Sequence, residues 1–221
     1  MQHYDVLIAT PGTKLEADYV DSLVKTLEEC NKKNISYRWL NGKSSLVHHA
    51  RELTATGGDG FTLNPNHKGP LGDSITYNKI FWIDSDIQWK PEDFFKLYYS
   101  DLEVVSGAYL LANGKTTAVH LINSQLPLSK KDAMKMKDVC QAQTIGFGFV
   151  AVKSGVFEKI ERPWFSHLSQ EITNDLGIKI YDSVGEDISW CIKASNCGVP
   201  IYFDPSVLVN HIKTVQITWD N

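Results

Sequence analysis

The chain has 221 residues, of which 43% are hydrophobic and 22% are charged, and its formal net charge is −4. This length supports one sizeable hydrophobic core and is too short for two full α/β domains. The composition is ordinary for a soluble globular protein. Because the charge balance is acidic, we expect no broad surface for polyanions, and a nucleic-acid partner would need a local basic patch.

The sequence carries no sign of a membrane or secretory segment. No apolar run approaches the roughly 20 residues that a membrane helix requires, and residues 1–5 lack the regions of a signal peptide. The four cysteines show neither a CxxC pair nor a metal-like spacing. We expect reduced, mostly buried thiols in a cytoplasmic protein without a transmembrane segment.

Short apolar runs alternate with amphipathic segments along the chain. The runs predict strands at residues 6–9, 35–40, 79–83, 104–111, 147–152 and 201–203. Helices are expected from a capping box at Thr13 and Glu16 to Cys30, and at residues 45–56, 92–99, 154–160 and 186–196. Residues 57–78 predict a loop, and residues 112–143 give no clear assignment. This order predicts an α/β fold with a mostly parallel central sheet flanked by helices.

Two carboxylates follow the most apolar of these strands. Asp84, Ser85 and Asp86 come directly after residues 79–83, and open α/β sheets bind their ligands beyond the carboxyl ends of the strands. Two acids at such a position repel each other unless a cation neutralises them. Oxygen ligands of this kind suit Mg²⁺ or Mn²⁺. The alternative interpretation is an Asp-rich turn with no bound cation.

A second acidic pair, Glu186 and Asp187, opens the amphipathic helix 186–196. Carboxylates at a helix N-terminus are stabilised by the helix dipole by roughly 0.3–1 kcal/mol each, which by itself explains both acids. The functional interpretation makes Asp187 a general base that takes a proton from an acceptor hydroxyl.

Three further residues are candidates for the same site. His211 follows the apolar run 207–209, where a lone histidine is usually structural; if it folds back to Asp86, it adds a nitrogen ligand and favours Mn²⁺. Gly146 and Gly148 flank Phe147. Glycines here indicate either close approach of a ligand to the backbone or a β-bulge.

The order of these segments resembles glycosyltransferases of the GT-A fold, particularly the family-2-like group. The resemblance spans residues 6–213 and rests on Asp84-Ser85-Asp86, Val105–Tyr109, Gly146–Gly148, Gly185–Asp187, Asp204-Pro205 and His211. It implies a single GT-A domain over residues 1–221, with a nucleotide-binding half at about 1–111 and an acceptor and catalytic half at about 112–221.

The resemblance also implies roles for individual positions. The metal, Mn²⁺ or Mg²⁺, would be bound by Asp86 and His211, with Asp84 nearer the ribose or a metal-bound water. The implied donor-binding positions are Thr10, Pro11, Arg51, Asp84, Ser85, Asp86, Gly146 and Gly148. Among them, Thr10 and Pro11 match the loop that holds the nucleobase. Arg51 matches a base or phosphate contact, with a cation on the helix surface as the alternative.

The activity that the resemblance implies is transfer of a sugar from a nucleotide-diphosphate donor to the hydroxyl of a glycan or another acceptor. A UDP-sugar is favoured as the commonest donor of such enzymes. Asp187, with Glu186 beside it, matches the catalytic base of inverting members. Many relatives bind the acceptor with a C-terminal extension, which we expect this chain to lack. The acceptor site is then expected from residues 112–145, residues 161–184 or a partner chain in a homo-oligomer.

Three other functions remain as alternatives. A sugar-phosphate nucleotidyltransferase would need a long Gly-rich basic signature after the first strand, and residues 10–14 are too short for it. A nucleotide-sugar or glycan-binding module without turnover would not require Asp187. Transfer to modified DNA would need a local patch such as Lys130, Lys131, Lys135 and Lys137, against the net acidity of the chain.

Overall fold

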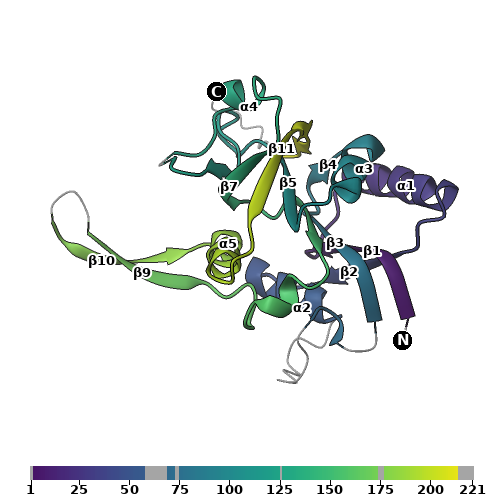
Figure 1. Ribbon diagram of the computed structural model, residues 1–221, viewed down its shortest axis with the longest axis horizontal. Coiled ribbons are helices and arrows are strands. Elements are labelled where there is room, and N and C mark those ends of the chain that lie inside the picture. The colour runs from purple at the N-terminus through teal and green to yellow at the C-terminus, as the bar shows by residue number, and fades with distance from the viewer. Residues whose placement is uncertain (1, 58–68, 73–74, 125, 174–176, 214–221) are drawn as a thin grey trace, which may run out of the picture.

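The computed structural model describes residues 2–57, 69–72, 75–124, 126–173 and 177–213. Its centre is an eight-stranded sheet with the strand order β2-β1-β3-β8-β5-β11-β7-β6 (Figure 1). Strands β8 and β7 run antiparallel to their neighbours, so the other six strands all point in one direction. The expected α/β fold with a mostly parallel sheet is confirmed, and the antiparallel strands make the sheet mixed.

The strands of this sheet alternate with helices along the chain. The sheet consists of β1 (Gln2–Pro11), β2 (Tyr37–Gly42), β3 (Ile75–Ile83), β5 (Val104–Ala108), β6 (Val119–Leu121), β7 (Cys140–Ile145), β8 (Phe149–Lys153) and β11 (Ile201–Leu208). The helices are α1 (Ala17–Lys32), α2 (Val47–Thr56), α3 (Pro91–Tyr99), α4 (Lys130–Ala133), the 3₁₀-helix η2 (Phe157–Lys159) and α5 (Glu186–Asn196).

Successive residues of the central strands are buried on opposite faces of the sheet. In β3, Ile80 and Trp82 belong to a core cluster shared with α2, η2 and α5. Phe81 and Ile83 belong to a second cluster, shared with α1 and α3. Because side chains of a strand alternate between faces, the unbroken apolar run of β3 places it in the middle of three layers. Burying each large side chain contributes roughly 1.5–3 kcal/mol.

Two small sheets complete the fold. The strands β9 (Leu168–Thr173) and β10 (Lys179–Val184) form an antiparallel hairpin that extends away from the central sheet, at the left of Figure 1. The strands β4 (Ile87–Gln88) and β12 (Asn210–His211) pair antiparallel beside the end of β3. None of the helices in the described ranges is long and apolar enough to cross a membrane.

Several element boundaries differ from the prediction. The capping box at Thr13 is wrong: α1 begins at Ala17, and the amide of Glu16 donates to the carbonyl of Ser85 instead. The helix predicted at 154–160 shortens to η2, because Gly155 adopts a left-handed φ of 89° just before it. The helix predicted from residue 45 begins at Val47 and ends, as expected, before a left-handed Gly57.

The structure also adds elements that the pattern of hydrophobic residues did not predict. Strands β6 and β7 lie in the stretch without an assignment, and β9 and β10 lie in residues 161–184. Residues 75–78 of the predicted loop belong to β3, whereas much of the remaining loop lies outside the described residues. Among the cysteines, Cys30 and Cys191 are buried, Cys140 is half-buried and Cys197 is exposed, and all four are free thiols.

Candidate functional site

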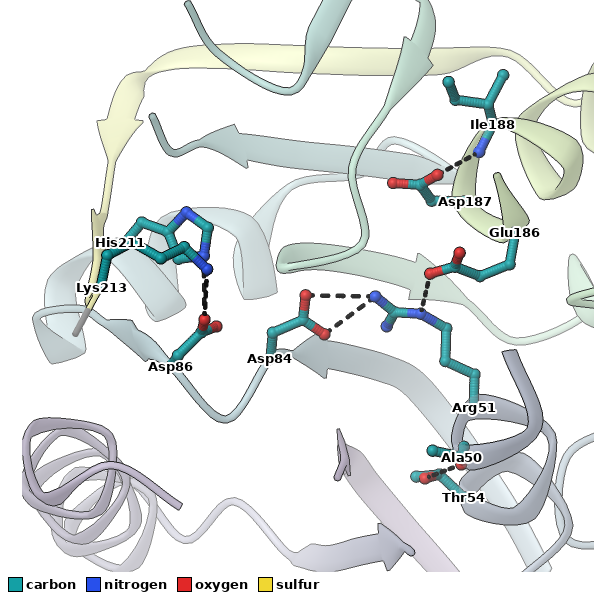
Figure 2. A network of polar contacts seen from close by, with 10 residues as sticks. All are labelled: Ala50, Arg51, Thr54, Asp84, Asp86, Glu186, Asp187, Ile188, His211 and Lys213. Atoms are coloured by element: carbon teal, nitrogen blue, oxygen red, sulfur yellow. Dashed lines mark hydrogen bonds and ion pairs between the residues drawn. The ribbon is translucent and has the colours of Figure 1, made fainter. Parts of the chain in front are cut away.

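The predicted site residues gather beyond the carboxyl ends of β1 and β3. Figure 2 shows Asp84 and Asp86 on the turn after β3, Arg51 on α2, Glu186 and Asp187 at the start of α5, and His211 on β12. The turn is closed by the amide of Ile87, which donates to the carbonyl of Asp84. The topology therefore brings together four carboxylates and two basic side chains from four separate segments, as the parallel arrangement of β1 and β3 predicts.

Arg51 forms the centre of a buried ion cluster. Its Nη2 lies 3.0 Å from Asp84 Oδ1, and its Nε lies 3.2 Å from Glu186 Oε1. The residue is only 2% exposed, so it is not the surface cation that the sequence left as an alternative. Burial alone would lower the pKa of Arg51, but the charges of Asp84 and Glu186 outweigh it and raise the pKa. Arg51 thus stays charged and joins α2, β3 and α5.

One nitrogen of this guanidinium is unused. Arg51 Nη1 is buried and has no hydrogen-bond partner among the described residues. The ring faces of Trp82, Phe147 and Phe165 lie within 6.0 Å of the guanidinium carbon. This apolar enclosure strengthens the ion pairs of Arg51 and makes the loss of any one partner costly.

Asp86 forms a second cluster with two cations. His211 Nε2 lies 3.1 Å from Asp86 Oδ2, and Lys213 Nζ lies 2.8 Å from the same oxygen. Although burial opposes ionisation, these two hydrogen bonds lower the pKa of Asp86 to about 2. The structure therefore places His211 against Asp86, as the sequence analysis considered. Lys213 is a contact that the sequence analysis missed, and its position two residues after His211 is the signal that could have found it.

The orientation of His211 is determined by its second ring nitrogen. His211 Nδ1 lies 2.8 Å from the carbonyl oxygen of Leu110, which can only accept. Nδ1 therefore carries a proton, and Nε2 is the atom that faces Asp86. The ring also packs edge-on against Tyr109, with centroids 5.1 Å apart. Burial lowers the pKa of His211, but the hydrogen bonds to Asp86 and Leu110 outweigh this effect and raise it.

Asp187 lies at the start of α5 near Glu186 and forms an ion pair with neither Arg51 nor Asp84 among the described residues (Figure 2). Its Oδ1 accepts a hydrogen bond from the backbone amide of Ile188 at 2.8 Å. Burial and the nearby charge of Glu186 raise the pKa of Asp187. A carboxylate with a raised pKa and a free oxygen has the properties of a general base.

Gly146 and Gly148 make room for an aromatic side chain rather than forming a regular strand. A Cβ atom at Gly148 would lie 2.6 Å from Tyr109 Cε1, and one at Gly146 would overlap the Tyr109 hydroxyl. The carbonyl of Gly148 also accepts from the amide of Asp84 at 3.1 Å. Both glycines therefore border the site, and they do so by admitting Tyr109, which the sequence analysis did not single out for a role.

The end of β1 is joined to β2 by polar side chains. The hydroxyl of Thr10 contacts Tyr19 Oη and accepts from Trp39 Nε1 at 3.0 Å. Asn41 Nδ2 donates to the carbonyl oxygens of Thr10 and Gly12, at 2.7 and 3.0 Å. Pro11 ends β1, and Ser85 lies opposite Gly12. The predicted nucleobase loop is thus rigidly tied to β2 and to the turn that carries Asp84 and Asp86.

A groove of about 870 Å³ lies along α5, next to the acidic pair. Its lining combines aliphatic side chains with neutral hydrogen-bonding ones and contains no Asp, Glu, Lys or Arg. The lining residues are His120, Ile122, Asn123, Ser124, Gln143, Thr144, Val184, Ile188, Ile192, Ser195 and Asn196. Ile188 directly follows Asp187, so one end of the groove begins beside the candidate base.

The donor atoms near Asp86 suit a hard divalent cation. Asp86 offers a carboxylate and His211 offers Nε2, held in position by the hydrogen bond of Nδ1 to Leu110, which is how metal-binding histidines are usually oriented. Asp84, however, is paired with Arg51. Within the described residues, no three His, Cys, Asp or Glu side chains converge on one point as a metal cluster would require.

Comparison with known proteins gives matches of structure alone. No family model matches the sequence, and no curated protein matches it. The fold matches A197 from STIV with a TM-score of 0.52 and 18% identity, over 100% of both chains. It also matches GalNAc-T7, whose crystal structure contains UDP, GalNAc and Mn²⁺, with a TM-score of 0.51 and 12% identity. That match covers 100% of this chain and 44% of GalNAc-T7. The matches support a GT-A-like, Rossmann-like fold.

Proposed function

We propose that this chain is a metal-dependent glycosyltransferase that moves a sugar from a nucleotide-diphosphate donor to an acceptor hydroxyl. One observation carries the proposal: Asp86 with His211, whose donor atoms suit a divalent cation, and Asp187, a half-buried carboxylate with no ion pair among the described residues, lie at the same end of a Rossmann-like sheet. The structural match to GalNAc-T7, which was solved with UDP and Mn²⁺, supports this chemistry and favours UDP as the nucleotide.

The donor would bind between the end of β1 and the turn after β3. Trp39, which is partly exposed on β2 beside Thr10, offers an aromatic ring on which a nucleobase can stack. Asp86 and His211 would hold Mn²⁺ or Mg²⁺, which supplies positive charge to the leaving diphosphate. Arg51 Nε and Nη2 contact carboxylates and its remaining nitrogen, Nη1, is buried, so we do not place Arg51 on the phosphates. We assign it to positioning Asp84 and Glu186.

The acceptor would be activated by Asp187. A buried carboxylate with a raised pKa accepts a proton more readily than an exposed one. Direct attack of the deprotonated hydroxyl on the anomeric carbon inverts the configuration there. Glu186 remains paired with Arg51, and its charge beside Asp187 raises the basicity of the catalytic carboxylate.

The groove along α5 is the proposed site of the acceptor. It begins beside Asp187 and is lined by residues of 120–124 and 143–144 together with Val184, within the two segments from which the acceptor site is expected. Neutral amides and hydroxyls between aliphatic side chains match the hydroxyls and C–H faces of a glycan. A polyanionic acceptor such as DNA would need cations that this lining does not contain.

The test is thermal-shift binding of UDP, GDP, CMP and dTDP, each with and without Mn²⁺. The variants are Asp86→Asn, Asp187→Asn and, as a control on an exposed helix position, Asp21→Asn. We expect one nucleotide to stabilise the wild type in the presence of Mn²⁺. Asp86→Asn should lose this stabilisation, and Asp187→Asn and Asp21→Asn should keep it. No stabilisation by any nucleotide would refute the donor site.

A transfer assay then separates an enzyme from a binding module. With the nucleotide identified, its sugar donors are screened for hydrolysis and for transfer to glycan acceptors. Asp187→Asn should bind the nucleotide and lose transfer by about 10²-fold or more. If Asp187→Asn transfers as well as the wild type, Asp187 is not the base.

A further inference from the structure

Lys213 and His211 share one carboxylate oxygen of Asp86, the residue proposed to bind the metal ion. Lys213 Nζ and His211 Nε2 both contact Asp86 Oδ2, at 2.8 and 3.1 Å. Figure 2 shows the two side chains approaching this one carboxylate together. One oxygen with two cationic partners has little capacity left for a third, so a divalent cation that binds Oδ2 in the reach of His211 Nε2 must displace Lys213 or His211 from it.

The backbone explains why both cations arrive at the same place. His211 pairs with Ile87 across β12 and β4, and the amide of Ile212 donates to the carbonyl of Asp86 at 2.8 Å. Because side chains two residues apart along an extended segment point the same way, tethering Ile212 to Asp86 directs both neighbours of Ile212 onto the carboxylate. Lys213 is therefore brought to Asp86 by the same pairing that positions His211.

The two cations differ in how firmly they are held. The side chain of His211 is 13% exposed, packs against Tyr109 and donates through Nδ1 to Leu110. The side chain of Lys213 is 47% exposed, and Asp86 is its one described hydrogen-bond partner. His211 has a structural reason to remain when another cation arrives, whereas Lys213 can turn into solvent at little cost.

We propose that Lys213 is an exchangeable counter-ion of Asp86, which neutralises this carboxylate in the metal-free protein and leaves it when a divalent cation binds. The inference rests on the proposed function, because it concerns the same metal position. Lys213 then has a role opposite to that of a metal ligand, because the lysine competes with the metal ion for Asp86. This competition raises the concentration of metal ion that is needed to fill the site.

The test measures binding of Mn²⁺ alone, by electron paramagnetic resonance of free Mn²⁺ or by calorimetry, with no nucleotide present. Lys213→Met removes the charge, Lys213→Arg keeps it, and Asp86→Asn removes the proposed site. A coupling free energy between two binding equilibria of one protein typically changes an affinity by about 5- to 150-fold. We therefore expect Lys213→Met to bind Mn²⁺ at least about five-fold more tightly than the wild type does. The affinity of Lys213→Arg for Mn²⁺ should stay within about two-fold of the wild-type affinity.

Control measurements keep the result interpretable. Circular dichroism and the Tm of each variant without metal show that it is folded, and Lys213→Gln provides a second neutral side chain should Lys213→Met fold poorly. Equal or weaker Mn²⁺ binding by the neutral variants overturns the inference. A tighter affinity that persists when Asp86→Asn is combined with Lys213→Met also overturns it, because the metal would then bind elsewhere.

The failure of this inference is distinguishable from failure of the proposed function. If the wild type and Lys213→Met bind Mn²⁺ equally and UDP stabilises both, the glycosyltransferase proposal stands and the inference that Lys213 competes with the metal is refuted. If neither protein binds Mn²⁺ while a nucleotide still stabilises the wild type, both the metal requirement and the inference fall, and the nucleotide site alone survives.

Discussion

Tyr109 lies between the two halves of the candidate site, with its ring edge-on to His211 at a centroid distance of 5.1 Å and its hydroxyl end against Gly146 and Gly148. It is 8% exposed, and burial raises the pKa of its hydroxyl. Tyr109 therefore packs between the turn that precedes β8 and the histidine that faces Asp86. The absence of a Cβ at both glycines is what allows this packing.

Replacing Gly146 by alanine is expected to destabilise the protein through Tyr109. The new Cβ would overlap the Tyr109 hydroxyl, and overpacking of a core typically costs about 1–3 kcal/mol. Urea unfolding of Gly146→Ala, Tyr109→Phe and the double variant measures this coupling. Because Tyr109→Phe removes the overlapping oxygen, the double variant should be destabilised less than the sum of the two single changes. Additive effects would show that the clash is relieved elsewhere.

The sequence contains enough information to predict the layers of this fold and the side of the sheet where the site lies. The apolar run of β3 can be buried only between two helix layers, and the acids after it must then lie at its carboxyl end. Asp84 and Asp86 were singled out in this way, whereas Asp187 and His211 were singled out by the start of the helix 186–196, by the apolar run before His211 and by the resemblance. Periodicity did not reveal β6, β7, β9 and β10, because short strands at the edge of a sheet or in a hairpin carry few apolar residues.

The sequence could not predict which charges pair. Arg51 was expected at a base or phosphate, and the structure places it between Asp84 and Glu186, which lie 33 and 135 residues away in the sequence. Contacts over such separations depend on how α2 and α5 pack over the sheet. The contacts of Tyr109 and Lys213 were missed for the same reason, since both residues acquire their roles from neighbours that are distant in the sequence.

Removing the charge of Arg51 is expected to cost far more stability than removing a surface charge. Arg51→Met leaves the carboxylates of Asp84 and Glu186 without a counter-ion, and breaking a buried ion pair costs about 3–5 kcal/mol. The measurement is the free energy of unfolding in urea. Lys25→Met, which breaks an exposed pair with Asp21 on α1, is the matched control and should cost less than about 1 kcal/mol. Similar losses for both variants would contradict the buried cluster.

As the pH is lowered, the proposed enzyme should begin to lose activity at a higher pH than an enzyme whose base is a carboxylate of ordinary pKa. Asp187 acts as a base only when deprotonated, and burial together with the charge of Glu186 raises its pKa above 3.8. As the pH falls through this raised pKa, Asp187 is protonated and kcat/KM decreases. The profile of Glu186→Gln, which removes the neighbouring negative charge, should decline at a lower pH than that of the wild type. An unchanged acid limb would mean that another group controls it.

Filling the groove along α5 should separate donor chemistry from acceptor binding. Ile192 lines the groove one helical turn beyond Ile188 and is half-buried. Ile192→Trp would occupy space that a glycan needs. Thr10 and Trp39, at the proposed donor site, lie on β1 and β2, away from α5. We expect transfer to the acceptor to fall by about 10-fold or more, since each 1.4 kcal/mol of lost binding is a factor of ten. Hydrolysis of the donor should remain within about two-fold of the wild type.

A matched control for the groove is Val24→Trp, which adds the same bulk to an exposed position of α1. It should leave both transfer and donor hydrolysis unchanged, because α1 covers the opposite face of the sheet. Asn196→Ala removes one neutral hydrogen-bonding group from the groove and should raise the KM for the acceptor more than it lowers kcat. If Ile192→Trp impairs hydrolysis and transfer equally, the groove is part of the donor site or of the folding core. A loss confined to transfer places the acceptor along α5, on residues that follow Asp187 by one to three helical turns.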